Sequence, residues 1–210
     1  MSEMPDILKR VLGFKSIVHK EGSLYIWGIP MYFEVMSTRA AQQKIMVDEF
    51  GREEASSIIY SMGKLTSYNA LKTFNEKFGV AKTIPDKKKL LQYNTGQLDI
   101  IGAGKFEWSV MNFDKVHFVM RGNSAFAEVY KKSFGIQKHH VDFFIRGQVD
   151  AAVKYLTGKD VLAIETSCIA KGKKYCEFVI KERKKWDLKD PAIKKQLVRN
   201  IPETEKLILY

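Results

Sequence analysis

Residues 161–181 read VLAIETSCIAKGKKYCEFVIK, two runs rich in β-branched and apolar residues that flank a short polar stretch. Such runs predict two strands, VLAIETSC and KYCEFVI, joined by a turn around Gly172. A turn centred on Gly172 places Cys168 directly opposite Cys176, where Cβ atoms of cross-strand neighbours lie about 4.5–5.5 Å apart. That separation suits two thiolates that share one metal ion with Glu165 as a third ligand, a cross-strand disulfide, or two buried thiols.

The chain has 210 residues, 45% of them hydrophobic and 12% aromatic, which is enough for a sizeable core. We expect one domain over residues 1–185, followed by a charged C-terminal helix and tail over 186–210. The N-terminus shows no apolar run behind a basic start, and no stretch approaches the roughly 18–20 apolar residues of a membrane span. We therefore expect a cytoplasmic protein, in which two cysteines favour thiols or metal ligands over a structural disulfide.

The formal net charge is +11. One interpretation is attraction to nucleic acid, an acidic surface or an anionic ligand. The other interpretation is a lysine-rich surface that does no more than contact solvent. The lysines are scattered along the chain and form no stripe on a single helix. This scatter favours the second interpretation, because proteins that bind nucleic acid usually cluster their charge.

Hydrophobic spacing and turn residues predict a mixture of long helices and strand pairs. Strands or bent strands are expected, besides the hairpin, at residues 23–36, 100–110 and 114–121. Helices are expected at residues 5–12, 37–50, 52–78, 85–98, 124–134 and 139–157, with a further helix after 186. Because single strands do not alternate with single helices, a doubly wound parallel sheet is disfavoured. We expect an α+β fold in which an antiparallel sheet has long helices packed on one side and a hairpin at its C-terminal end.

Sequence motifs for nucleotide binding and catalysis are missing. The chain has no Gly-x4-Gly-Lys-Ser/Thr run, and the pair Gly102 and Gly104 lacks the third glycine and following helix of a dinucleotide site. His-Glu-x-x-His and Gly-x-Ser-x-Gly are also absent. Two cysteines are too few for an iron–sulfur cluster held by four thiolates. The sequence therefore favours a binding protein over an enzyme, and it indicates no catalytic residue.

The hairpin and the helix that contains Gly147 resemble the 4-vinyl reductase domain family, a hydrocarbon-binding family that includes the sensor domains of phenol- and xylene-responsive activators. The pattern is Glu165-x2-Cys168, a turn with glycine, and Cys176-x-Phe, with a weaker likeness over residues 121–135. The family is more distantly similar to a TRAPP vesicle-tethering subunit. The resemblance implies a mixed α/β domain that forms a homodimer and encloses a small hydrophobic or aromatic ligand.

The resemblance also implies a structural zinc site in the hairpin. In the phenol sensors, zinc is held by a cysteine on the penultimate helix and by Glu, Cys and Cys in the hairpin. The last three match Glu165, Cys168 and Cys176. The helix cysteine is replaced here by Asp142, so the fourth ligand is an Asp142 oxygen or a nitrogen of His139 or His140. Four protein ligands would leave no open position, which is typical of a structural zinc ion.

A regular strand would not allow this ligand set. Glu165 and Cys168 are three residues apart, so they would point to opposite faces of a regular strand. Both can reach one ion only if the strand bulges or turns at Ser167.

A pocket for a hydrophobic ligand would need apolar side chains and a few placed polar groups. Our candidates on the strands and flanking helices are Tyr93, Phe106, Trp108, Phe118, Met120, Arg121 and Phe144. The alternative for each apolar candidate is ordinary core packing. Arg121 stands just before a helix capped by Asn123 or Ser124, where it could hold a carboxylate or phosphate. Its alternative is a surface ion pair with Glu128 or Asp114.

Three functions follow from these observations. The first is a dimeric, zinc-stabilised domain that senses or carries a small hydrophobic molecule and passes its signal to a protein partner. The second is a reductase of a tetrapyrrole vinyl group, which rests on the family resemblance alone. The third is binding of nucleic acid or another acidic surface through the positive charge.

Overall fold

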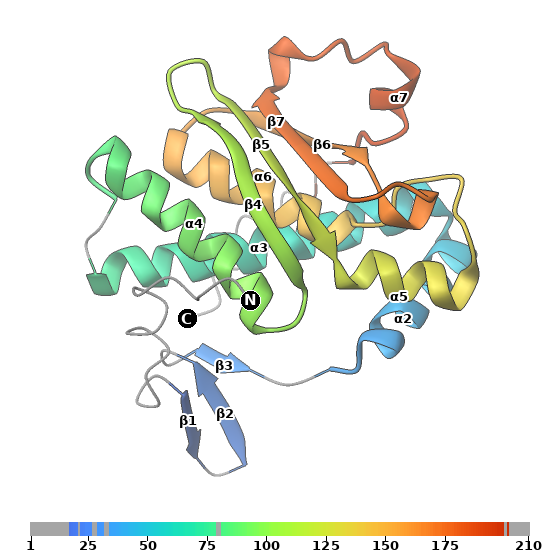
Figure 1. The fold of residues 1–210 in the computed structure, drawn as a ribbon, viewed down its shortest axis with the longest axis horizontal. Coiled ribbons are helices and arrows are strands. Elements are labelled where there is room, and N and C mark those ends of the chain that lie inside the picture. The colour runs from blue at the N-terminus through green and yellow to red at the C-terminus, as the bar shows by residue number, and fades with distance from the viewer. Residues whose placement is uncertain are drawn as a thin grey trace.

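The computed structural model describes residues 17–20, 22–26, 29–31, 34–78, 81–199 and 201. At its centre lies a four-stranded antiparallel sheet with the strand order β4-β5-β7-β6 (Figure 1). Its strands are Gly104–Asn112 (β4), His117–Ser124 (β5), Val161–Ser167 (β6) and Cys176–Glu182 (β7). β6 and β7 form the predicted hairpin, which joins the sheet through β5. The short helix expected at 5–12 lies outside the described residues.

Long helices pack against the sheet and against one another. They are Met36–Phe50 (α2), Arg52–Phe78 (α3), Ile84–Ile100 (α4), Ala125–Phe134 (α5) and Phe143–Thr157 (α6). A short helix, Pro191–Lys194 (α7), follows the hairpin. α6 packs against β6 and β7, α4 packs against β4, and α3 packs along α6 (Figure 1). The expected α+β class is therefore confirmed. No helix in the described part of the chain is long and apolar enough to cross a bilayer.

Local signals account for several helix ends. The side chain of Thr83 accepts a hydrogen bond from the backbone N–H of Asp86, and the carboxylate of Asp86 accepts one from the Thr83 backbone, which is the reciprocal cap that starts α4. Ser124 caps α5 through the backbone N–H of Ala127, so of the two predicted caps it is Ser124 that serves. Gly51 ends α2 at a positive φ of 76°.

A second, small antiparallel sheet precedes the helices. It consists of Ile17–Lys20 (β1), Ser23–Ile26 (β2) and Ile29–Met31 (β3). The prediction of a strand pair within 23–36 is confirmed by β2 and β3. β1 was not predicted, because its four residues lack the aromatic run that marks the following strand.

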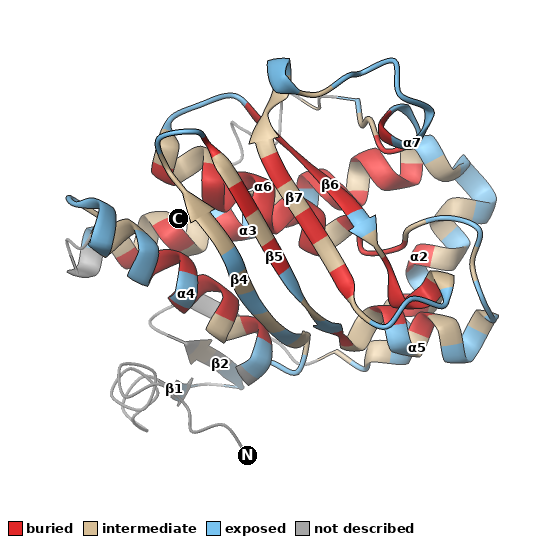
Figure 2. Cartoon of the chain, turned by 45° about the horizontal axis from the view of Figure 1, so that its top comes forward, coloured by how far each residue is buried: buried red, intermediate tan, exposed pale blue. Residues whose placement is uncertain are grey.

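The core lies between the main sheet and the helices (Figure 2). Phe118 and Met120 on β5 and Phe178 on β7 are fully buried on the inner face of the sheet. A second, smaller cluster lies where Leu162 and Ile164 of β6 contact Ile193 of α7. Both faces of β6 are therefore covered, one by α6 and the other by the segment that follows the hairpin.

Two glycines set the distance between α3 and α6. A Cβ atom on Gly63 would lie 2.1 Å from the carbonyl oxygen of Phe144, and one on Gly147 would lie 2.0 Å from that of Tyr60. Neither position has room for a side chain, because the backbones themselves are in contact. The crossing is reciprocal, with a glycine from each helix against the backbone of the other.

Some predicted boundaries are wrong. α4 continues to Ile100 and a turn follows, so the strand expected from residue 100 starts at 104. The helix expected from 139 starts at Phe143. The residues before it form a connector that is tied to the hairpin loop by the hydrogen bond from the Gln137 N–H to the Ala170 carbonyl. Helical spacing could not reveal this tie, because it joins segments far apart in the sequence.

Candidate functional site

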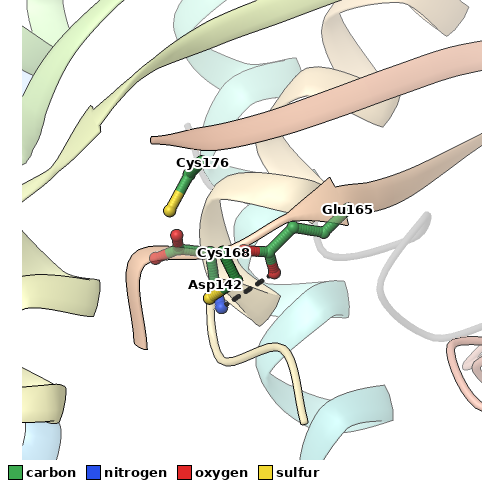
Figure 3. Close-up of side chains that lie close together, drawn as sticks. All are labelled: Asp142, Glu165, Cys168 and Cys176. Carbon is green, nitrogen blue, oxygen red and sulfur yellow. Dashed lines mark hydrogen bonds between the residues drawn. The ribbon is translucent and has the colours of Figure 1, made fainter. Parts of the chain in front are cut away.

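Four buried side chains meet at one end of the main sheet: Asp142, Glu165, Cys168 and Cys176 (Figure 3). Each offers a carboxylate oxygen or a sulfur, and these atoms all lie within 4.8 Å of one another. Asp142 immediately precedes α6, Glu165 lies on β6, and the two cysteines lie on either side of the hairpin loop. Both cysteines are free thiols.

The hairpin departs from regular pairing where the site requires it. Glu165 is paired with Phe178, but Ser167 is paired with Glu177, so the residue between them is an extra one on β6. This bulge lies between Glu165 and Ser167, immediately before the expected position. Because the extra residue shifts the side-chain alternation by one, Glu165 and Cys168 point to the same side. The loop then turns through a short 3-10 segment, Ile169–Lys171, whose first N–H donates to the sulfur of Cys176 at 3.3 Å.

The two carboxylates have only part of their hydrogen-bonding capacity used. The hydroxyl of Ser124 donates to Oδ1 of Asp142 at 2.7 Å, and the backbone N–H of Asp142 donates to Oε2 of Glu165 at 3.3 Å. Oδ2 of Asp142 and Oε1 of Glu165 are buried and have no hydrogen-bond partner among the described residues. A buried carboxylate oxygen without a partner carries a substantial desolvation cost. A cation bound between these oxygens and the two sulfurs would remove that cost.

The donor set matches zinc. Tetrahedral zinc accepts thiolate sulfur at about 2.3 Å and carboxylate oxygen at about 2.0–2.2 Å, so neighbouring ligand atoms would lie about 3.5 Å apart. A separation within 4.8 Å therefore needs only a small contraction around the ion. The residues present fit a four-coordinate zinc ion with two sulfur and two oxygen ligands.

Burial changes the protonation of this cluster. Removal from water, aided by the neighbouring Cys168, raises the pKa of Asp142 to about 7. The same burial, together with the charge of Asp142, raises the pKa of Glu165 well above its usual value. A hydrogen bond with Cys176 lowers the pKa of Cys168 to about 6, whereas that bond raises the pKa of Cys176. In the metal-free protein the site therefore retains protons near neutral pH.

The structure does not bring the two candidate histidines into this cluster. Asp142 completes the group of four, and neither His139 nor His140 belongs to it in the described part of the chain. Both residues lie on the connector before α6, where His139 is exposed and His140 is half-buried. Burial and the nearby cations Lys171 and Arg146 lower the pKa of His140 to about 3. Of the three candidates for the fourth ligand, the geometry favours Asp142.

Two residues beside the cluster were not predicted as site residues. The side-chain amide of Gln196 pairs with both the N–H and the carbonyl of Glu165, at 2.9 and 2.8 Å. Arg146, which is only 2% exposed, donates to the backbone and side-chain oxygens of Gln196. In the sequence Arg146 lies off the helical stripe of apolar residues such as Ile145 and Val149, which left it as either an anion-binding residue or a surface ion-pair partner. Gln196 lies in a charged segment and has no sequence signal at all.

Five of the predicted ligand-binding residues come together between the sheet and the helices. Phe118, Met120 and Tyr93 are buried there, and Phe106 and Trp108 pack against them. The Trp108 and Phe118 rings meet edge to face with centroids 6.2 Å apart. The polar groups of two of these side chains are hydrogen-bonded within the protein: the Trp108 Nε1–H donates to the Leu91 carbonyl, and Gln97 donates to the Tyr93 hydroxyl.

The other two predicted ligand-binding residues lie elsewhere. Arg121 follows Met120 on β5 and therefore points to the opposite, outer face of the sheet. It donates to Oε2 of Glu177 at 2.6 and 3.0 Å and covers the Tyr175 ring, so its ion pair is with a cross-strand neighbour that was not expected. Phe144 points toward α2, where the Arg39 guanidinium lies 5.2 Å from the ring centroid.

Comparison with solved structures identifies the fold. The chain superimposes on the crystal structure of the phenol-responsive sensory domain of the transcription activator PoxR, determined with phenol, with a TM-score of 0.78. The match covers 95% of this chain and 100% of the other at 18% sequence identity. The chain has the phenol-sensor fold. At this identity the likeness defines the fold alone, and in this fold the candidate metal cluster and the aromatic cluster occur together.

Two further structures are more distant. A trafficking protein particle complex subunit 3 from Naegleria fowleri, covalently bound to palmitic acid, matches with a TM-score of 0.49 at 11% identity, over 70% of this chain and 93% of that one. A vinyl-4-reductase family protein from Methanocaldococcus jannaschii matches with a TM-score of 0.45 at 17% identity, over 87% and 98%. Comparison of the sequence with protein-family models finds no match, and neither does comparison with curated proteins.

Proposed function

We propose that this chain is a sensory domain that binds a small hydrophobic or aromatic molecule. The observation that carries the proposal is the aromatic cluster of Tyr93, Phe106, Trp108, Phe118 and Met120 inside a fold that a phenol-responsive sensor shares over 95% of this chain. Apolar walls with a few fixed polar groups are the usual lining of a small-molecule site. The rings pack against one another, so binding requires side chains of the cluster to move apart.

We further propose that Asp142, Glu165, Cys168 and Cys176 hold a structural zinc ion. When bound, zinc would supply a fixed cross-link between the start of α6 and the hairpin, with no open coordination position for chemistry. The residues themselves contribute the two unpartnered carboxylate oxygens and the two sulfurs described above. Because α6 forms one wall of the core, such a cross-link would hold that wall against the sheet.

Phenol and toluene are suitable probes of the aromatic cluster. We expect Trp108→Phe to weaken binding of the better probe by about tenfold, because the smaller ring loses roughly 1–2 kcal/mol of apolar contact. Arg121→Ala is the matched control, because Arg121 lies on the outer face of the sheet. This variant should bind the probe with the affinity of the wild type. Isothermal titration calorimetry measures both. The proposal is contradicted if neither probe binds the wild type, or if the two variants lose affinity equally.

Zinc binding should depend on pH with a defined sign. Asp142 has a pKa of about 7 and that of Glu165 is also raised, so the metal-free site holds protons that zinc must displace. We expect zinc affinity to fall as the pH is lowered below 7, by about tenfold per pH unit for each displaced proton. Competition with a chelator of known affinity between pH 5.5 and pH 8 measures the slope. A flat profile would exclude this site as the place where zinc binds.

Native mass spectrometry of the full chain, purified without chelator, tests the composition of the protein. We propose a homodimer with one zinc ion per chain and a small organic molecule that dissociates on collisional activation. A metal-free monomer would contradict both the metal site and the dimer, and the functions based on the charge of +11 would then take precedence.

A further inference from the structure

The segment that follows the hairpin is attached to the main sheet at the proposed metal ligand Glu165. β6 is an edge strand of the main sheet, and the segment 186–199 runs along it on the way back to α3 (Figures 1 and 2). The Trp186 Nε1–H donates to the Leu162 carbonyl at 3.0 Å, and Ile193 packs on the outer face of β6. At its far end the segment reaches α3, where the Arg199 N–H donates to the hydroxyl of Ser57.

Gln196 makes the central contact of this segment. Its side-chain oxygen accepts from the Glu165 N–H at 2.9 Å and its side-chain nitrogen donates to the Glu165 carbonyl at 2.8 Å, as a neighbouring strand would do. The side chain is 3% exposed, so water cannot replace either bond without the segment moving away. Gln196 therefore fixes the backbone of the residue whose carboxylate faces the two cysteines.

Arg146 holds Gln196 in this orientation. Its Nη1 donates to the Gln196 backbone oxygen at 2.9 Å and to the side-chain oxygen at 3.1 Å. Arg146 is itself buried on α6, four residues after Asp142, and its guanidinium lies over the Tyr60 ring of α3. Gln196, in the C-terminal segment, therefore connects α6, which begins next to Asp142, with β6, which carries Glu165.

We infer that Gln196 is a positioning residue for the metal ligand Glu165, and that metal binding and docking of the segment 186–199 are therefore coupled. The inference rests on the proposed zinc site. A cation would hold the side chain of Glu165 to Asp142 and the two cysteines, while Gln196 holds the backbone of the same residue, so both contacts fix one position of β6. The coupling is reciprocal. The factor by which zinc raises the equilibrium constant for docking of the segment equals the factor by which docking raises the affinity for zinc.

Hydrogen exchange of the full-length protein, with zinc and after chelation, tests the coupling directly. We expect zinc to slow exchange of the backbone amides of residues 193–199 by about tenfold or more, a typical strength for coupled sites. Amides of β4, which lies at the opposite edge of the sheet, serve as the internal reference and should change less. Zinc that binds but leaves exchange of 193–199 unchanged relative to β4 would overturn the inference and leave the metal site intact.

Variants at Gln196 test the reverse direction. Gln196→Leu keeps most of the side-chain volume and removes both bonds to Glu165, so zinc affinity should fall by about tenfold, the same factor as above. Gln196→Glu keeps an acceptor for the Glu165 N–H and for Arg146, so its zinc affinity should lie between those of Gln196→Leu and the wild type. Lys194→Ala, an exposed change in the same segment, should leave zinc affinity unchanged. A Gln196→Leu protein that is less stable but binds zinc with wild-type affinity assigns Gln196 a packing role only, whereas a wild type that binds no zinc refutes the metal site and this inference together.

Discussion

Removing the proposed zinc ion should cost the protein a large part of its stability. A ligand that binds only the folded state and is present at a thousand times its dissociation constant stabilises that state by about 4 kcal/mol. For a domain of this size, such a loss lowers the melting temperature by roughly 10 °C. We therefore expect a drop of this order when chelator is added to the wild type, measured by differential scanning calorimetry.

Replacing Cys168 and Cys176 together by serine assigns this effect to the cluster. The double variant should melt close to the chelated wild type and should not respond to zinc or chelator, because only Asp142 and Glu165 would remain of the four ligands. The response to zinc is the decisive quantity, since burying two hydroxyls in place of thiols has a cost of its own. If chelator leaves the melting temperature of the wild type unchanged, the cysteines are buried thiols.

Gly147→Ala should destabilise the fold by at least about 3 kcal/mol. The added Cβ would lie 2.0 Å from the Tyr60 carbonyl oxygen, and the backbone of a packed helix cannot yield by more than a few tenths of an ångström. α3 and α6 would have to separate, and the core that α6 shares with the sheet would open with them. Urea denaturation followed by circular dichroism measures the change in unfolding free energy.

Gly158→Ala, the matched control, makes the same chemical change at the end of the same helix. Gly158 has a φ of 66° and nothing within 4 Å of an added Cβ, so alanine there should cost only about 1–2 kcal/mol of backbone strain. Gly63→Ala should resemble Gly147→Ala. The double variant Gly63→Ala with Gly147→Ala should cost less than the sum, because helices already forced apart have room for the second methyl group. Equal losses of unfolding free energy for Gly147→Ala and Gly158→Ala would show that α3 and α6 can separate at little cost.

The two predictions concern the two places where α6 is held. Near its first residue, Asp142 meets the hairpin in the candidate metal cluster, and in its first half Gly147 meets α3. Between them these contacts fix α6 against the core in which Phe118 and Met120 lie. A change at either place should therefore also alter binding in the aromatic cluster, without any direct contact to a ligand.

Features that depend on local spacing could be predicted from the sequence. The helix at 52–78 follows from apolar residues at helical spacing and a glycine beyond its end, and it is present with those bounds. The hairpin follows from β-rich runs around Gly172. A bulge or turn at Ser167 was expected from the condition that Glu165 and Cys168, three residues apart, reach one ion, and the bulge lies between Glu165 and Ser167. Each of these inferences compares residues close together along the chain, where backbone geometry alone limits the possibilities.

The sequence by itself therefore determined the α+β class and the hairpin, and it named Glu165, Cys168 and Cys176 as candidate metal ligands with Asp142, His139 and His140 left open as the fourth. The tertiary structure decided that Asp142 completes the cluster, that Arg121 faces away from the aromatic core, and that Phe144 packs toward another helix. It also buried Arg146 and brought Gln196 to Glu165 across thirty-one positions of sequence. The reason is physical: spacing along one element shows which side chains share a face, but the partner that each face meets depends on how separate elements pack.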